Sequence, residues 1–550
     1  MQVTFSVLAL FATYLAYEQL WYGKAVRAPG GGRVPGPAHV TPLLGGIVDM
    51  VLHPYEFWER QRQWALSVPS GMSYNSLVGK MILFVTEVDT CREVLAVNDP
   101  KRMLMTLHPS AKNILGPNNL AFMHGPEHKN IRKSFMHLFT RKALGTYVEI
   151  QDQVIREHLD LFLKRSKSGP AAENGSSGTA SSSESSGAKP SSPFSSLSHQ
   201  EIRDWVRDMN QETSQRVFLG PYLPPGPEKE AFGRNYRNIT DGFLAFPLCV
   251  PGTAVWRARQ SRFKVLAVLL RCANDALAAA RRGDHEPCCL LDYWCERCLK
   301  EAADAEARGA PAPPHTTPLR IADAVLDFLF ASQDASTASL TWSVTLTADH
   351  PEVLRRVRLE QAAVRGADRG ATVTGDVLRR MRYTRQVAKE VLRLRAPAPM
   401  VPQLALADYR LKDGYVVPKG TLVMPSLNAV TLSGFPNAEA FDPDRFSDER
   451  KEELLYGKHL VTFGHGPHYC VGKEYAINQL TCFLALLASA CDYDRKRTDR
   501  SDQWIYLPTI YPADALVAFA PRTEEEHAAD VAEANASGLT AQLAADATEA

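Results

Sequence analysis

The stretch that most constrains this chain lies near its C-terminal end, where residues 463–472 read Phe-Gly-His-Gly-Pro-His-Tyr-Cys-Val-Gly. It places one cysteine, Cys470, in a glycine-rich loop, and an amphipathic helix is expected to follow from Lys473 to Ala490. The positive end of a helix favours a thiolate over a thiol. Glycines, which have no Cβ, let the loop backbone approach a flat ligand closely. The alternative is that Cys470 is a buried core residue after a turn.

A lone thiolate held in this way, without a second cysteine or histidine at the spacing of a metal site, suits a metal that brings its own other ligands, as haem does. The whole stretch resembles the haem-binding loop of the cytochromes P450, the haem-thiolate monooxygenases, which reads Phe-x-x-Gly-x-x-x-Cys-x-Gly. His468 stands where the family usually has an arginine. The resemblance implies a haem b cofactor with Cys470 as the axial ligand of its iron. It also implies cofactor contacts from Phe463, Gly464, Gly466, His468 and Gly472.

Length and composition agree with one large domain around such a cofactor. The chain has 550 residues, of which 45% are hydrophobic, and this is enough for a single large α-rich core. The resemblance implies the P450 fold, which is mainly α-helical with a smaller β-rich region. The formal net charge is +1, so the chain as a whole makes no case for nucleic acid as a partner.

The N-terminal residues predict a membrane anchor. Residues 1–17 carry no charged side chain and are mostly apolar, and the next five residues could extend this run to a spanning helix over residues 1–22. Basic residues follow the run instead of preceding it, which favours an uncleaved anchor over a cleaved signal peptide and a cytosolic catalytic domain. We therefore expect a single-pass protein of the endoplasmic reticulum membrane. The sequons at Asn174, Asn238 and Asn535 would then stay unmodified.

The rest of the chain divides by composition. Residues 23–45 are rich in proline and glycine and predict a hinge, and residues 46–522 predict the haem-thiolate catalytic domain. Within it, residues 166–196 are of low complexity and residues from about 283 to 317 are irregular and partly basic, so both are expected to be disordered inserts. The acidic, alanine-rich residues 523–550 are expected to be a disordered tail.

Four of the ten cysteines cluster between Cys288 and Cys298, close to His285. The pair Cys295-x-x-Cys298 beside Cys288-Cys289 could bind zinc. The spacing fits no complete zinc site, however, so incidental thiols in a loosely packed insert are the favoured interpretation.

One long helix, expected from Leu319 to about Ala348, has an unusual middle that reads Phe-Leu-Phe-Ala-Ser-Gln-Asp-Ala-Ser-Thr at residues 328–337. Asp, Ser and Thr are poor helix formers, so a local kink with a solvent-facing Asp334 is one interpretation. In the family an acid and a threonine at this place open a groove for dioxygen and supply protons. The resemblance puts Asp334 at the acid position and Ala335 at the threonine position. Ser336, Thr337 or a water would then have to relay protons.

Further positions are predicted to bind the haem propionates. His128 and Arg132 lie four residues apart on one face of a helix expected to begin near Pro126. On their own they would be a solvated surface pair. In the family a tryptophan and an arginine at this spacing reach the propionates, and a further arginine position falls on Gln403. Since His128, Gln403 and His468 replace the usual residues, we expect a propionate clamp with less positive charge than is usual in the family.

Glu390 and Arg393 lie three residues apart on one face of a helix expected to begin near Arg385. An exposed pair of this kind contributes only about 0.3–0.5 kcal/mol to stability. The resemblance implies instead a buried triad that Arg445 completes. Its role would be structural, because it would brace the segment that precedes the haem loop.

Several stretches, residues 328–337, 388–403, 418–446 and 463–476, resemble one group within the family, the sterol C-22 desaturases of plants, algae and fungi. The resemblance implies an enzyme that uses dioxygen and NADPH-derived electrons to introduce a double bond at C-22 of a sterol side chain. The candidate walls of the sterol pocket, each of which could also be ordinary core packing, are Phe330, Ala331, Ala335, Ala398, Met400, Val401 and Ile510.

Electrons are expected from a separate NADPH–cytochrome reductase in the membrane, which would dock on Lys129, Lys133 and Lys473. Rival functions are a sterol hydroxylase or a sterol 14-demethylase on the same fold, and a haem protein that senses or transports without catalysis. The sequence does not decide between sterols with 24-methyl and 24-ethyl side chains, because a difference of one carbon is worth only about 1–3 kcal/mol and depends on pocket shape.

Overall fold

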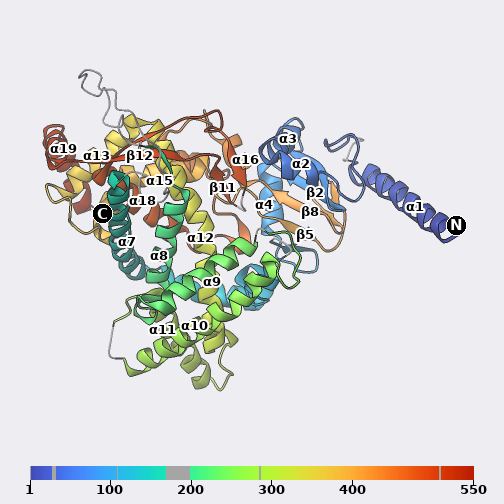
Figure 1. Ribbon diagram of the computed structural model, residues 1–550, viewed down its shortest axis with the longest axis horizontal. Helices are drawn as coiled ribbons and strands as arrows, with labels where there is room; N and C mark the ends of the chain where they lie inside the picture. The colour runs from blue at the N-terminus through green and yellow to red at the C-terminus, as the bar shows by residue number, and fades with distance from the viewer. Residues whose placement is uncertain are drawn as a thin grey trace, which may run out of the picture.

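The computed structural model describes residues 2–27, 32–107, 110–168, 198–243, 245–283, 286–506 and 509–549. Helices dominate this part of the chain (Figure 1). They are α1 (Gln2–Ala25), α2 (Ile47–Leu52), α3 (Pro54–Leu66), α4 (Val88–Ala96), α5 (Ala111–Leu115), α6 (Gly125–Phe135), α7 (Arg141–Ser168), α8 (Arg203–Leu219), α9 (Pro227–Phe243), α10 (Ala254–Arg282), α11 (Leu290–Ala307), α12 (Pro318–Asp349), α13 (Pro351–Arg365), α14 (Gly375–Arg380), α15 (Arg382–Leu394), α16 (Leu427–Gly434), α17 (Glu452–Leu455), α18 (Lys473–Ala490), α19 (Glu524–Ala536) and α20 (Leu539–Glu549).

A smaller β-rich lobe lies beside the helices, next to α2, α3 and α4 (Figure 1). Its five-stranded sheet has the order β1-β2-β8-β5-β3. The strands β1 and β2 form an antiparallel hairpin, whereas β2 and β8 pair in parallel, so residues far apart in sequence meet in one sheet. The strands of this sheet and of the smaller sheets β4-β12-β9, β10-β11 and β6-β7 are β1 (Met72–Leu77), β2 (Lys80–Val85), β3 (Met103–Met105), β4 (Gln200–Glu201), β5 (Gln403–Ala405), β6 (Tyr409–Arg410), β7 (Val416–Val417), β8 (Leu422–Pro425), β9 (Cys491–Arg495), β10 (Trp504–Tyr506), β11 (Ile510–Pro512) and β12 (Leu516–Pro521).

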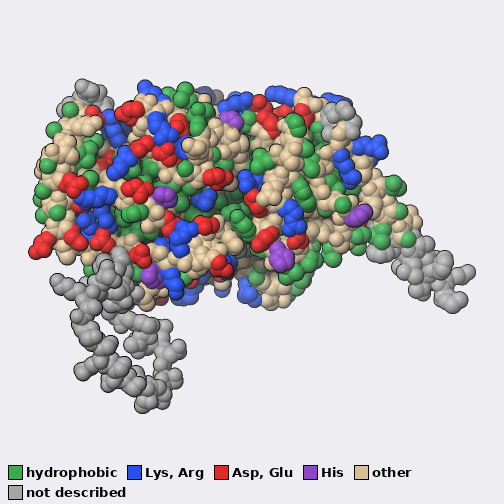
Figure 2. All heavy atoms as spheres, turned by 90° about the horizontal axis from the view of Figure 1, so that it is seen from above, with side chains coloured by type: hydrophobic (Ala, Val, Ile, Leu, Met, Phe, Trp, Pro, Cys, Tyr) green, Lys and Arg blue, Asp and Glu red, His purple; other side chains and the backbone are tan. Residues whose placement is uncertain are grey.

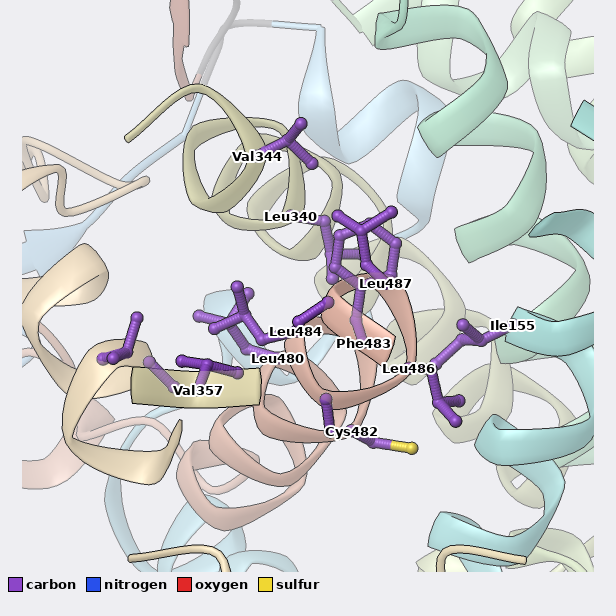
Figure 3. Packing of buried hydrophobic residues seen from close by; sticks show 14 of the residues in the cluster. Ile155, Leu340, Val344, Val357, Leu480, Cys482, Phe483, Leu484, Leu486 and Leu487 are labelled. Atoms are coloured by element: carbon purple, nitrogen blue, oxygen red, sulfur yellow. The ribbon is translucent and has the colours of Figure 1, made fainter. Parts of the chain in front are cut away.

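The helix α18 forms the centre of the main core. Its apolar residues cover almost the whole helix surface, which is the pattern of a helix buried on all sides. Figure 3 shows Leu480, Phe483 and Leu487 packed among side chains of α7, α12 and α13. Because α18 begins three residues after Cys470, this core also fixes the position of the cysteine loop.

Two segments expected to be disordered are ordered. Within residues 283–317, α11 buries Leu290, Trp294 and Cys298 in the core that it shares with α10. The Trp294 and Phe135 ring centroids are 4.8 Å apart. The prediction of a disordered insert was therefore wrong here, because the apolar side chains recur on one face of a helix and offset the ordering entropy. Of the other predicted insert, α7 extends to Ser168 and residues 169–196 lie outside the described residues.

The tail at 523–550 was also wrongly predicted to be disordered. A capping box between Thr523 and Glu526 begins α19. Asp530 is 2% exposed and binds Arg522 and Arg355, while Ala534 and Leu543 lie in the main core. The helices α19 and α20 are thus packed against the main core.

The N-terminal helix α1 extends to Ala25, three residues beyond the predicted anchor. Its end contacts the β-rich lobe, where the Tyr22 hydroxyl donates a hydrogen bond of 2.7 Å to Ser76. In the described part of the chain, no helix combines the length and the apolar character needed to cross a membrane. The anchor over residues 1–22 stays a prediction. Figure 2 shows basic and acidic side chains interspersed over one face of the molecule, in keeping with the small net charge.

Candidate functional site

A cavity of about 260 Å³ lies between α12, α18 and the segment at residues 397–401. Most of its wall is apolar, and the cysteine loop supplies one side of it. The lining residues are Phe139, Phe218, Phe328, Ala331, Ser332, Ala335, Ser336, Ser339, Leu340, Leu392, Pro397, Ala398, Val401, Leu427, Thr462, Phe463, Gly464, His468, Cys470, Val471, Gly472, Tyr475, Ala476, Gln479 and Leu480.

Cys470 lines this cavity, and its side chain is exposed to it. The Cys470 N–H donates a hydrogen bond of 2.9 Å to the Phe463 carbonyl, which closes the loop. Burial raises the pKa of the Cys470 thiol, whereas a hydrogen bond from the Gly472 N–H and the charge of Arg132 act to lower it. A metal ion at the sulfur would deprotonate the thiol outright.

Three histidines gather beside the cysteine loop. The His128 and His468 ring centroids are 4.3 Å apart, and those of His124 and His468 are 5.1 Å apart. Burial lowers the pKa of His128 to about 4 and that of His468 to about 3, so both rings are neutral at physiological pH. The buried Nε2 atoms of His124 and His128 have no hydrogen-bond partner among the described residues. The sequence analysis missed His124, although it precedes His128 and Arg132 at a spacing of four.

The geometry brings Arg132 to the same loop, where its guanidinium donates a hydrogen bond to the Tyr469 carbonyl. Gln403 is buried in β5, and Gly466 packs against the backbone of Leu95 and Ala96; neither lines the cavity. The propionate contact predicted for Gln403 therefore stays a prediction.

On α12, five residues with small side chains line the cavity: Ala331, Ser332, Ala335, Ser336 and Ser339. Asp334 is not among the lining residues. Burial raises its pKa to about 6, against the lowering effects of Arg207 and Tyr511. The acid therefore lies on the side of α12 that packs against α8 and β11, and it is not simply solvent-facing.

Thr337 does not fit the predicted role in proton relay. Its side chain is fully buried and does not line the cavity. The Thr337 hydroxyl donates a hydrogen bond of 2.7 Å to the Gln333 carbonyl and accepts one of 3.1 Å from Asn210. One residue along a helix turns a side chain by about 100°, which is why Ser336 reaches the cavity and Thr337 does not.

Of the seven predicted pocket residues, Ala331, Ala335, Ala398 and Val401 line the cavity. Phe330, Met400 and Ile510 do not line this cavity, although Met400 lines a second one, and their contact with a sterol stays a prediction. Phe330 packs against Phe243, with ring centroids 4.8 Å apart. Met400 packs in a separate cluster with Trp58 and Phe84. Ile510 is 2% exposed. Its backbone N–H donates a hydrogen bond to the Pro397 carbonyl, and its own carbonyl accepts one from the Trp342 indole N–H.

Several lining residues were missed by the sequence analysis. Val471 lies in the turn before α18, and Tyr475 and Gln479 follow at a spacing of four, which puts these two on one face of that helix. This spacing was a usable signal. Phe139 and Phe218 come from distant helices, and only the tertiary structure brings them to the cavity.

The predicted triad forms as a buried cluster. Arg393 donates two hydrogen bonds, of 2.6 and 2.8 Å, to the Glu390 carboxylate. Arg445 lies 3.4 Å from the same carboxylate and also binds Glu452, which is a fourth member that the sequence analysis missed. Burial raises the pKa of Glu390, and both arginines act to lower it. The guanidiniums also bind backbone carbonyls at Asn437, Ala438 and Ala440, so the cluster holds the segment that precedes the loop.

These residues fit a haem. A thiol faces a largely apolar cavity. The unpartnered Nε2 atoms of His124 and His128, together with Arg132 nearby, are donors suited to carboxylates such as propionates.

Comparison with known proteins agrees with this site. Residues 280–504 match the family described as Cytochrome P450. Cytochrome P450 710A4 of Arabidopsis thaliana is 37% identical over 92% of this chain and 94% of that protein. The C-22 sterol desaturase erg5 of Aspergillus fumigatus is 30% identical over 92% of this chain and 91% of that protein. The solved structure of retinoic acid-bound cyanobacterial CYP120A1 has a TM-score of 0.68 at 21% identity, over 89% of this chain and 100% of that chain. The chain therefore belongs to the cytochrome P450 family.

Proposed function

We propose that this P450 is a sterol C-22 desaturase. Family membership implies a haem-iron cofactor, dioxygen and an electron donor. The finer assignment is supported by the relatives, since the fungal C-22 sterol desaturases of Aspergillus fumigatus and Candida albicans are 30% and 27% identical over 92% of this chain. The observation that carries the proposal is the wall of small and apolar side chains that α12 adds to the cavity, because this wall would leave room for an aliphatic sterol side chain beside a bound haem.

Bound haem b would supply the activation of dioxygen that breaks unactivated C–H bonds. The protein itself must then position the substrate, because desaturation and hydroxylation differ only in which atom reacts second. Ala331 and Ala335 form a wall of small side chains on α12, and Ala398, Val401 and Leu427 line the cavity from other segments. We propose that this wall presents C-22 and C-23 of the sterol together to the reacting centre.

Ser336 is the hydroxyl that we propose for proton delivery in this site. It lines the cavity next to Ala335, which occupies the position of the threonine usual in the family. Ser332 lies one turn before it and hydrogen-bonds Ser214 at 3.0 Å, so a second hydroxyl faces the same space. Asp334, with its pKa near 6, is an acid on the other side of the same turn.

We further propose that electrons come from NADPH through a separate reductase and that the protein resides in the endoplasmic reticulum membrane through residues 1–22. Lys129 and Lys133 are exposed on α6, the helix that carries Arg132 to the cysteine loop. Lys473 lies at the start of α18 over the Phe463 ring. These three cations are the proposed docking face for an acidic reductase surface.

The test is incubation of the haem-loaded protein with reductase, NADPH and sterols that have saturated 24-methyl or 24-ethyl side chains. Desaturation predicts a product that has lost two hydrogens at C-22 and C-23, identified by mass spectrometry. A stable 22-alcohol as the end product would indicate a hydroxylase, and loss of the 14-methyl group would indicate a demethylase. Absence of NADPH-dependent turnover would favour a non-catalytic haem protein.

A further inference from the structure

The structure brings two thiols and a carboxylate together at the start of α11, far from Cys470 in sequence. The ligand atoms of Cys288, Cys289 and Asp292 all lie within 4.8 Å of one another. Each of the two sulfurs is 3.3 Å from the same carboxylate oxygen, Oδ2 of Asp292. Cys295 and Cys298 do not take part, because their sulfurs are buried against the carbonyls of Ala273 and His315.

The carboxylate in this cluster is held in a fixed orientation. The Tyr222 hydroxyl donates a hydrogen bond of 2.6 Å to Oδ1 of Asp292, and the Cys288 N–H donates one of 3.0 Å to Oδ2. Only 2% of Asp292 is exposed, so these hydrogen bonds hold its carboxylate in a buried position.

The backbone around the cluster is closely fitted. Gly220 has a φ of +49° at the end of α8, and a Cβ built there would lie 2.8 Å from the Cys289 Cβ. A glycine at this position thus lets the 3₁₀ turn η4 (Gly220–Tyr222) approach the cysteines. Cys289 is fully buried beneath this turn, whereas Cys288 is exposed and leaves one side of the cluster open to solvent.

These distances match a tetrahedral thiophilic site. Zinc binds sulfur at about 2.3 Å and carboxylate oxygen at about 2.1 Å, which places sulfur and oxygen roughly 3.6 Å apart in a tetrahedron. The observed separations of 3.3 Å need only a small expansion. We propose that Cys288, Cys289 and Asp292 bind one Zn²⁺, with a water at the open fourth position beside Cys288. Binding replaces the two thiol protons, which are released to solvent, by the metal ion.

The test uses the full-length, haem-loaded protein, in which Cys470 is already a ligand. The protein is reduced, stripped with a chelator and titrated with Cd²⁺, whose bonds to thiolates give an ultraviolet charge-transfer band. We expect the band to saturate at one Cd²⁺ per chain and Zn²⁺ to displace it. The variants Cys288→Ser and Asp292→Asn should lose this saturable band. Cys249→Ser, which removes a partly exposed cysteine elsewhere, is the matched control and should keep it.

The proposal is overturned if Cys288→Ser keeps the saturable band, or if Cys249→Ser loses it to the same extent. A band that rises without saturating at one equivalent would also overturn it, since that is the behaviour of scattered thiols. Because Cys288 is exposed, its serine variant should fold normally even if Asp292→Asn does not. Native mass spectrometry of the Zn²⁺-loaded protein gives an independent count of bound metal.

Discussion

At the residue scale, two kinds of buried charged group are important in this P450: the paired cluster around Glu390 and the acid Asp334. Glu390, Arg393 and Arg445 are each at most 1% exposed. Asp334 instead lies partly buried beside Arg207 and Tyr511, and its pKa is raised to about 6. Removing the partner of a buried charge lowers the stability of the folded state strongly. A buried acid with a raised pKa instead makes that stability depend on pH.

Replacing Glu390 by Gln should destabilise the protein by about 3–5 kcal/mol, because it leaves Arg393 buried without a carboxylate and leaves Arg445 with Glu452 alone. Haem retention should fall as well, since those guanidiniums hold the segment before the cysteine loop. Denaturant unfolding and the haem-to-protein ratio measure the two effects. Asp444→Asn is the matched control, because its pair with Arg356 is about half exposed and is worth about 0–1 kcal/mol. Equal losses in the two variants would contradict a special role for the buried cluster.

The Asp334→Asn variant should change how stability depends on pH. The pKa of Asp334 is about 6 in the folded state and about 3.9 in an unfolded chain. Its protonated form is favoured by folding, so the stability that it contributes is complete below about pH 4 and is lost as the pH rises through 6. Relative to the variant, the wild type should therefore lose up to about 3 kcal/mol between these pH values.

Urea unfolding at a series of pH values from about 4.5 to about 7.5 tests this prediction. The matched control is Asp204→Asn, at an exposed position of α8. If the stability curves of wild type and Asp334→Asn run parallel, the carboxyl is not protonated by burial.

At the element scale, spacing predicted structure well and composition predicted it poorly. The helix from Lys473 to Ala490 was predicted with the bounds that α18 has, because a glycine loop precedes a continuous apolar pattern. Composition suggested disorder for α11 and α19. Yet Leu290, Trp294 and Cys298 recur at a spacing of four, and Thr523 and Glu526 form a capping box, so both helices carried local signals.

For the candidate site, the motif residues could be predicted because they are local in sequence, as in the loop around Cys470. The pocket walls were predicted only in part. Ala331 and Ala335 follow from the helical repeat of α12, but Phe139 and Phe218 reach the cavity through helix packing. Packing between distant helices depends on many side chains at once, and no short motif encodes it.

Removing the C-terminal helices tests whether they belong to the domain. A chain that ends at Arg522 loses Asp530, so that Arg522, 8% exposed, keeps only Asp492 at 3.6 Å. We expect a loss of about 3 kcal/mol in the free energy of unfolding, because Ala534 and Leu543 no longer bury apolar surface in the main core and Arg355 and Arg522 lose Asp530. A chain that ends at Gly538 retains α19 and is the matched control, with a smaller loss. A chain ending at Arg522 that unfolds like the wild type would show that these contacts add nothing.

At the scale of the whole molecule, the cysteine loop joins the β-rich lobe to the helical core. Gly466 has a φ of +73°, and a Cβ built there would lie 2.5 Å from the Leu95 carbonyl oxygen and 2.9 Å from the Ala96 Cα. Both neighbours are backbone atoms of α4, which packs in the lobe. On its other side the loop continues into α18, the centre of the main core. The position of the loop is therefore fixed both by α4 of the β-rich lobe and by α18 of the main core.

Gly466→Ala should accordingly cost more than backbone strain alone. A left-handed conformation costs an alanine about 1–2 kcal/mol, and the contact with α4 adds a displacement of the loop. We expect a larger loss of stability and a lower haem content than in Gly538→Ala. Gly538 has a φ of +78° and nothing within 4 Å of a built Cβ, so it isolates the strain. Similar thermal unfolding and haem content in the two variants would refute the tight contact.

The close fit of Gly466 on α4 also bears on how P450s can be recombined. A cysteine loop taken from another family member arrives with a backbone path shaped against that protein's own helix. In this chain that loop would have to pack against the backbone of Leu95 and Ala96, where no side chain can change its rotamer to relieve a clash. Exchange of the loop together with α4 should therefore give working hybrids more often than exchange of the loop alone, because the two segments form one interchangeable unit although more than 360 residues separate them.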